Sequence, residues 1–302
     1  MKRSVIRLAG KTHVVSLPSK WVKQFNIKKG EELDIEERGN KLVISTEKDL
    51  KRDSITIDTD KIGLFNKNYI SFAYQKGYDE VELRYDGQDV FNLIRERVND
   101  LMGYEIVDHG KDHCRIKNVS QLLDSEFDIM LRRSFLVTLD MAETCVDFIA
   151  KKQHDKLKEL AYLEKTNNKF TDFCKRLINK KGYHEIDKSA LIYAILRDIE
   201  EVADQYKYIC KHGYETKVNL SKETIALFEE VNSYFRTLYE LFYKFDKNKA
   251  SKIVFKKKDL MNKLQELFFK TKNNDEKLII HHLMCLTEAV FNMYGPCFVM
   301  NL

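Results

Sequence analysis

The chain has 302 residues, of which 33% are charged and 43% hydrophobic, and its formal net charge is +5. This composition is ordinary for a globular protein, and the length predicts two or three domains. No run of eighteen apolar residues occurs and the basic N-terminus lacks a long apolar core, so we expect neither a membrane span nor a signal peptide. The six cysteines form no CxxC pair, which favours buried reduced thiols and a cytoplasmic protein.

Residues 10–45 carry a dense series of local signals. An apolar β-branched run stops at Pro18, and Ser19 can cap the short helix that follows. A turn at Gly30 needs a positive φ, and two alternating strands are then joined by a hairpin turn at 38–40. The predicted order is therefore strand, short helix, turn, strand, hairpin, strand.

The segment VSLPSKWVKQFNIKKGEELDIEERGNKLVIS, residues 15–45, resembles the AbrB/MazE/SpoVT-type swapped-hairpin family. The resemblance covers about residues 1–48. It implies a β-barrel that is completed only when two chains exchange hairpins, in a module that binds DNA or only dimerises. Fewer than fifty residues bury little surface alone, which is an independent reason to expect a homodimer.

The positive charge is concentrated at this end of the chain. Residues 1–30 contain eight Lys or Arg and no Asp or Glu. Such a local field favours polyanions, because neutralised phosphates dominate non-specific DNA binding. The predicted DNA-binding residues are Lys2, Arg3, Arg7, Lys11, Lys20 and Lys23. DNA-binding relatives tend to carry arginines where this chain has His13, Val22 and Lys23, so we expect contact with phosphate more than readout of bases.

Residues 49–120 predict a small α/β linker domain. The pattern gives strands at 54–58 and 81–85, helices at 64–75 and 90–102, and a hairpin of 105–107 with 114–116. The first helix is expected to end at Gly77 and to share one face among Phe65, Tyr69, Phe72 and Ala73. No glycine-rich phosphate loop occurs, and we interpret His109 and His113 as loop histidines beside Gly110.

Residues 121–302 predict an all-α bundle. The apolar periodicity gives helices at about 124–151, 154–181, 187–212, 221–247, 250–272 and 275–294. Gly182, Gly213 and Gly295 fall where periodic runs stop, as is typical of helix C-termini. Short connections favour antiparallel neighbours, and two sets of three helices are the simplest grouping.

The helix LRDIEEVADQYKYICKHG, residues 196–213, resembles the signature helix of the PhoU family of phosphate-uptake regulators. The segments TLDMAETCVDFI, residues 138–149, and YDEVELRYD, residues 78–86, look like the archaeal-type members. Those members join a swapped-hairpin module, a small α/β segment and a PhoU-like bundle, so the resemblance spans essentially the whole chain. It implies regulation of phosphate uptake through DNA, a phosphate transporter or a sensor protein.

Glu200 and Asp204 lie four residues apart, so they share one helix face and can present two carboxylates to a cation. In the PhoU family such pairs build iron or zinc clusters, which makes these two residues the predicted metal ligands. Glu164 and Glu288 are weaker candidates, because Asn168 and Asn292 stand where the family has aspartate. The alternative is that these acids are ordinary polar residues of amphipathic helices.

The remaining motifs do not predict a catalytic or metal-binding site. His281-His282 predicts one buried and one exposed histidine, and residues 256–258 are three lysines that favour a solvated face. No Ser-His-Asp, Cys-His or Walker-type arrangement occurs, so we expect a binding protein that is not an enzyme. Two alternatives stay open: a scaffold at a membrane transporter whose N-terminal module only dimerises, and a metal-dependent enzyme built on Glu200 and Asp204.

Overall fold

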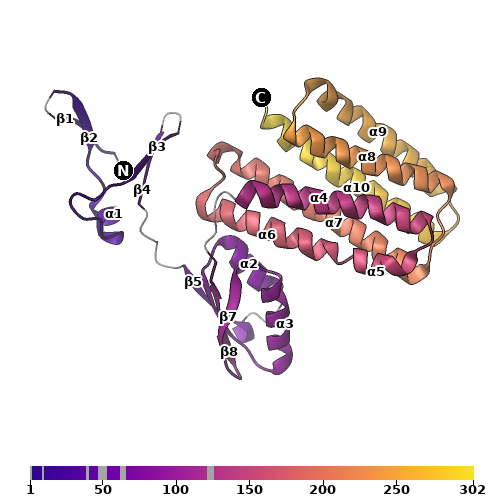
Figure 1. Ribbon diagram of the computed structural model, residues 1–302, viewed down its shortest axis with the longest axis horizontal. Coiled ribbons are helices and arrows are strands. Elements are labelled where there is room, and N and C mark those ends of the chain that lie inside the picture. The colour runs from indigo at the N-terminus through magenta and orange to yellow at the C-terminus, as the bar shows by residue number, and fades with distance from the viewer. Residues whose placement is uncertain (1, 9, 39–40, 47–52, 62–65, 121–125) are drawn as a thin grey trace. The chain divides into compact units, whose positions relative to one another are not determined.

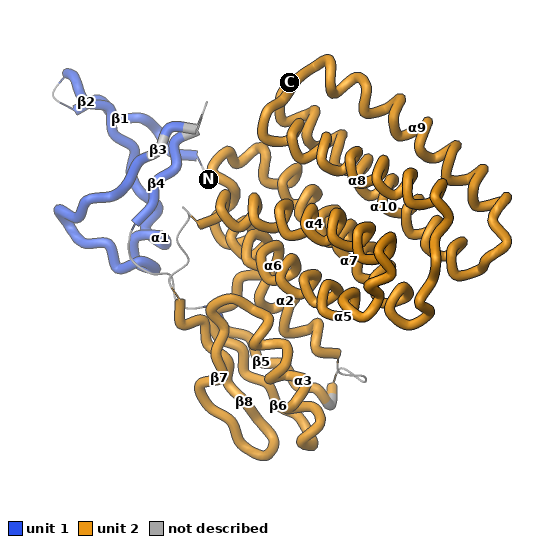
Figure 2. The backbone as a smooth tube through the Cα atoms, turned by 45° about the vertical axis from the view of Figure 1, so that its right-hand side comes forward, with its two compact units in different colours: residues 1–53 blue, residues 54–302 orange. Residues whose placement is uncertain are grey.

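The computed structural model describes residues 2–8, 10–38, 41–46, 53–61, 66–120 and 126–302. The chain divides into two compact units, residues 1–53 and 54–302 (Figure 2). The second unit holds two hydrophobic cores, one within residues 57–116 and one within residues 127–297. The first core lies among the strands and helices of residues 54–118, and the second lies among the helices of residues 126–299.

Unit 1 contains two hairpins and one short helix. Strand β1 (Val5–Leu8) pairs antiparallel with β2 (Thr12–Val15), helix α1 spans Ser19–Gln24, and β3 (Asp34–Arg38) pairs antiparallel with β4 (Lys41–Ser45). Gly30 has φ +83°, as its turn requires. The capping prediction is wrong: Ser19 lies inside α1, Pro18 precedes it as the N-cap, and no side chain caps this helix. Strand β1 was not predicted.

The described side chains of unit 1 form no core of their own. Every residue of 2–46 whose burial is described is exposed or half-buried. The two hairpins form separate two-stranded sheets, so the described part of one chain contains no closed barrel. The predicted exchange of hairpins concerns a second chain, which a single chain does not test.

The α/β domain begins unit 2. Its elements are β5 (Ser54–Asp58), a 3₁₀ turn (Thr59–Lys61), α2 (Asn68–Lys76), β6 (Glu80–Arg84), α3 (Gln88–Asn99), β7 (Tyr104–His109) and β8 (His113–Asn118). The strand order is β5-β6-β8-β7, and only the β5–β6 pair is parallel. Gly77 ends α2 with φ +104°, as predicted. His109 and His113 lie at strand ends and not in a loop.

The predicted buried face of α2 is only partly correct. Ile70, Ala73 and Tyr74 face the core, whereas Phe72 is 58% exposed and Tyr69 is half-buried. Phe65 lies outside the described residues. Tyr69, Ile70 and Phe72 lie within one turn and cannot all point to the same narrow face. The helix places Ile70 and Tyr74 against the sheet.

The bundle follows in six long helices and shorter turns (Figure 1). They are α4 (Glu126–Ala150), a 3₁₀ turn (His154–Lys156), α5 (Leu157–Leu160), α6 (Leu163–Lys181), a 3₁₀ turn (Ile186–Lys188), α7 (Ser189–Thr216), α8 (Lys222–Tyr243), α9 (Lys247–Lys270) and α10 (Asn274–Val299). Helices α4, α6 and α7 pack together, as do α8, α9 and α10, and α7 packs along α10. Among the described residues, every helix falls short of the length and apolarity that a membrane crossing needs.

Local signals explain where several helices begin. Ser221, Asp246 and Asn273 each accept a hydrogen bond from a free backbone N–H in the first turn, and so cap α8, α9 and α10. Gly182 follows α6 with φ +82°, as predicted.

Two glycine predictions are wrong. Gly213 lies inside α7 and Gly295 lies inside α10, next to Pro296. A Cβ at position 213 would lie 2.9 Å from Cδ1 of Leu157, so this glycine allows α5 to approach the backbone of α7. The predicted helix 154–181 is also interrupted, because α5 ends at Leu160 and α6 begins at Leu163.

Candidate nucleic-acid interface and charged seam of the bundle

The six predicted DNA-binding residues all belong to unit 1. Lys2 and Arg3 precede β1, Arg7 lies in β1, Lys11 lies in the turn before β2, and Lys20 and Lys23 lie on α1. All six are exposed, and within the described residues none of them forms an ion pair. We call this set the basic residues of unit 1. Their ammonium and guanidinium groups are free to contact an external anion.

The β1–β2 hairpin places Arg7 beside His13, two residues that the sequence analysis considered separately. Arg7 lies directly opposite His13 in the antiparallel register. Residues in such a pair project from the same face of the sheet, so the imidazole ring and the guanidinium group lie on one face. His13 therefore adds a hydrogen-bonding group next to Arg7.

The predicted metal ligand Glu200, on α7, is held by two groups of α6. Thr171 donates a hydrogen bond to Oε1, and the Lys175 ammonium lies 2.5 Å from Oε2. Burial raises the pKa of the Glu200 carboxyl, against the opposite pull of the Lys175 charge. The cation beside Glu200 is thus a lysine of the same chain.

A second lysine occupies the space between Glu164 and Asp204. The Lys207 ammonium lies 3.1 Å from Oε1 of Glu164 and also contacts Oδ1 of Asp204. Glu164 accepts a further hydrogen bond from Asn168 Nδ2 at 2.6 Å. Burial works against a charged Lys207, but the hydrogen bond with Asp204 and the charge of Glu164 raise its pKa.

The four predicted metal ligands therefore do not converge. Glu164 and Asp204 share Lys207, Glu200 pairs with Lys175, and Glu288 on α10 pairs with Lys257 of α9 at 2.8 Å. In the described ranges of the chain, no group of three or more His, Cys, Asp or Glu side chains could hold a metal ion. Iron or zinc binding stays a prediction, and a metal would have to displace a lysine.

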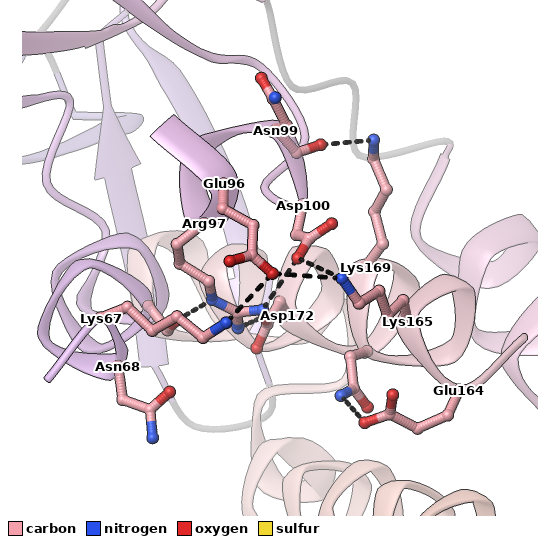
Figure 3. Close-up of polar contacts among 12 residues, drawn as sticks. Lys67, Asn68, Glu96, Arg97, Asn99, Asp100, Glu164, Lys165, Lys169 and Asp172 are labelled. Atoms are coloured by element: carbon pink, nitrogen blue, oxygen red, sulfur yellow. Dashed lines mark hydrogen bonds and ion pairs between the residues drawn. The ribbon is translucent and has the colours of Figure 1, made fainter. Parts of the chain in front are cut away.

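Helix α6 also carries a charged seam toward the α/β domain (Figure 3). Asp172 is 2% exposed and accepts hydrogen bonds from Arg97 at 2.8 Å and Gln75 at 2.6 Å. Burial raises the pKa of Asp172, opposed by the Arg97 charge. Glu96 lies 3.2 Å from Lys67 and 3.4 Å from Lys165, and these lysines lower its pKa, mainly through the Lys67 hydrogen bond.

Sequence reasoning missed this seam. Its residues on α6 are Lys165, Lys169, Asp172, Arg176 and Lys180. They recur every three or four residues, so they share one helix face. A charged stripe on a helix is normally interpreted as a solvated face. The available signal for an interface was that these charges have both signs.

The two adjacent histidines of α10 differ as predicted. His281 is exposed, and His282 is half-buried with Nδ1 2.8 Å from Oε1 of Gln205. Burial, and then the charges of His281 and His212, lower the pKa of His282 to about 4. Lys256 and Lys257 pair with acids, and Lys258 is exposed.

Comparison with known proteins gives one match. Residues 6–52 match the family model of the antidote-toxin recognition protein MazE, a bacterial antitoxin. This stretch falls in unit 1 and agrees with the predicted AbrB/MazE-type module. No curated protein and no solved structure matches the chain.

Proposed function

We propose that this protein is a homodimeric, DNA-binding regulator whose N-terminal unit contacts the duplex and whose helical bundle binds a partner or an effector. The observation that carries the proposal is that unit 1 exposes its apolar strands and all six predicted DNA-binding residues at once. The MazE-type match over residues 6–52 supports it.

The exposed strands support dimerisation. The apolar side chains that unit 1 leaves more than half exposed are Val5, Ile6, Leu8, Val15, Ile35 and Leu42. Six such residues in fewer than fifty form an apolar surface that a second chain would cover. Two chains that exchange hairpins would bury these strands in a shared barrel.

The charge pattern supports DNA as the ligand. A dimer would double the six exposed cations of each chain and present them on one small module. Eight of these twelve cations would be lysines, which contact phosphate as point charges, so affinity would exceed sequence discrimination. Arg7 and His13 are the residues best placed to add contacts to bases.

The resemblance of residues 196–213 to the PhoU signature helix extends the proposal to phosphate. The bundle would be two three-helix repeats that receive phosphate status from a phosphate transporter or sensor protein, in the cytoplasm and without catalysis. The grouping of α4, α6 and α7 beside α8, α9 and α10 is compatible with such repeats. Iron or zinc at Glu200 and Asp204 would be an added ligand only if Lys175 and Lys207 moved aside.

The test is duplex DNA binding by the full chain and by two matched double variants. Lys20→Gln/Lys23→Gln removes two exposed cations from α1, and Lys252→Gln/Lys258→Gln removes two exposed cations from α9. We expect the α1 variant to bind about tenfold more weakly, because each of the two exposed phosphate contacts contributes about 0.7 kcal/mol. The α9 variant should bind like the parent.

Equal affinity of the parent and both variants would contradict DNA contact through α1. A chain that dimerises but does not bind DNA at low salt would instead favour the alternative, in which unit 1 only dimerises and the bundle is a scaffold for a transporter or sensor protein.

A further inference from the structure

A groove of about 360 Å³ lies between the α5–α6 segment and the C-terminal half of α7. It is lined by Lys158, Ala161, Tyr162, Glu164, Lys165, Lys207, Lys211, Tyr214 and Glu215. The groove opens where the helix is interrupted between Leu160 and Leu163, beside the small side chain of Ala161. Its size is within the range of small-molecule sites.

Both walls of the groove carry lysines. Lys158 and Lys165 come from the α5–α6 side, and Lys207 and Lys211 come from α7, where they lie one turn apart. Two carboxylates also line it, Glu164 and Glu215, so the lining has four cations against two anions.

The four lysines of the groove differ in their ion pairs. Lys207 contacts Glu164 and Asp204, and Lys165 lies 3.4 Å from Glu96 and 4.0 Å from Asp100. Lys158 and Lys211 are exposed and form no ion pair with any residue that the structure describes. Two ammonium groups without an ion-pair partner among the described residues thus line the groove, and an anion bound there would be attracted to both.

Aromatic groups complete the lining. The Lys158 ammonium lies 5.7 Å from the ring centroid of Tyr214, and the Lys217 ammonium lies 4.5 Å from the same ring. Tyr162 adds a second ring and is 59% exposed. These rings offer flat apolar contact and hydroxyl donors to a bound molecule.

From this geometry we propose that the groove binds a phosphate-bearing small molecule with at least two negative charges. The choice of phosphate follows from the donors: the groove has lysines and no arginine, and separate ammonium groups suit a tetrahedral anion that accepts from several directions. A planar carboxylate would favour the fork of a guanidinium. The site rests on the proposed function in that it names the chemical class of effector for the bundle, but it requires neither DNA nor dimerisation.

The experiment is calorimetric titration of the full chain, without added magnesium, using tripolyphosphate, ATP, orthophosphate and adenosine. Lys158→Gln/Lys211→Gln removes the two uncompensated cations of the groove. Lys252→Gln/Lys258→Gln removes two exposed cations of α9, and Lys20→Gln/Lys23→Gln removes two from α1. Unchanged melting temperatures would show that all variants fold.

We expect tripolyphosphate and ATP to bind the parent, and the groove variant to lose about tenfold in affinity, because two charge contacts are removed. Both control variants should stay within about twofold of the parent. Equal binding of tripolyphosphate and ATP would identify the phosphate chain as the group that the groove recognises. Tighter binding of ATP would show that the rings of Tyr162 and Tyr214 also contact the ligand. Equal binding of orthophosphate would show that one phosphate group is enough for binding.

Absence of binding by all three anions, or equal anion affinity of the groove variant and the parent, would overturn the proposal. Loss of anion binding in the α1 variant alone would assign the anions to unit 1 and would likewise overturn it. None of these results bears on duplex DNA binding, which is measured separately.

Discussion

Arg176 on α6 donates a hydrogen bond to a carboxylate oxygen of Asp79 over 2.6 Å, and the Arg176 side chain has no exposed surface. The same guanidinium group donates to the backbone carbonyls of Tyr74 and Tyr78, both at 2.8 Å. It also lies 4.9 Å from the ring centroid of Tyr74. One buried cation therefore joins the bundle to the α/β domain and satisfies three acceptors there.

We predict that Arg176→Met lowers the free energy of unfolding by about 3–5 kcal/mol, because it removes three buried hydrogen bonds donated by a charged group and one cation beside Asp79. The matched control is Arg236→Met, which breaks a solvent-exposed pair with Glu143 and should cost less than about 1 kcal/mol. Urea unfolding monitored by circular dichroism measures both values. A difference below about 1 kcal/mol between the two variants would show that Arg176 adds no more than a surface pair.

Sequence reasoning worked where the determining signals are local. Pro18, Gly30 and Gly77 mark ends and turns through their own backbone preferences, so the order of elements from β2 to β4 and the end of α2 could be predicted. The helical periodicity of the bundle gave six long helices for the same reason.

The remaining features depend on contacts between distant residues. Gly213 does not end α7, because close packing of Leu157 favours a glycine within the helix. The pairing of Glu200 with Lys175 joins residues 25 apart, which no local spacing reveals. Lys207, three residues after Asp204, was within reach of sequence reasoning, because i and i+3 residues are neighbours on a helix.

The half-buried His282 predicts a pH dependence of stability. Its pKa is lowered to about 4 by burial and by the charges of His281 and His212, so the folded chain keeps it neutral when the unfolded chain is already protonated. The stability contribution of neutral His282 to the folded chain is fully present above pH 6.5, the ordinary pKa of histidine, and is lost as the pH falls toward 4.

We therefore expect the stability advantage of the parent over His282→Gln to be about 1 kcal/mol smaller at pH 5 than at pH 7, a value discounted for partial exposure to solvent. Urea unfolding at the two pH values measures it. Phe255→Ser, at a residue that is 75% exposed and has no titratable group, serves as the control and should show a constant difference. An advantage that grows toward pH 5 would have the wrong sign for a depressed pKa.

The exposed strands of unit 1 predict a dimer. The monomer mass is 35.7 kDa, and we expect light scattering of the parent to give about twice this value. Ile35 is 65% exposed in β3, and Ile35→Asp would place a charge in the shared barrel.

Ile35→Asp should therefore reduce the measured mass to that of a monomer, whereas Phe255→Ser, at a residue 75% exposed on α9, should leave the dimer intact. If Ile35→Asp stays dimeric, the strands of unit 1 do not form the interface.

The salt dependence of duplex DNA binding tests the central claim most directly. The full chain would be compared with a chain beginning at Ser54, which retains both hydrophobic cores of unit 2. With six predicted DNA-binding residues per chain, we predict that log affinity falls against log salt with a slope of about −5 per chain and up to about −10 for a dimer. The shortened chain should not bind. Equal binding by the two chains, or a slope near zero for the full chain, would contradict DNA recognition by unit 1.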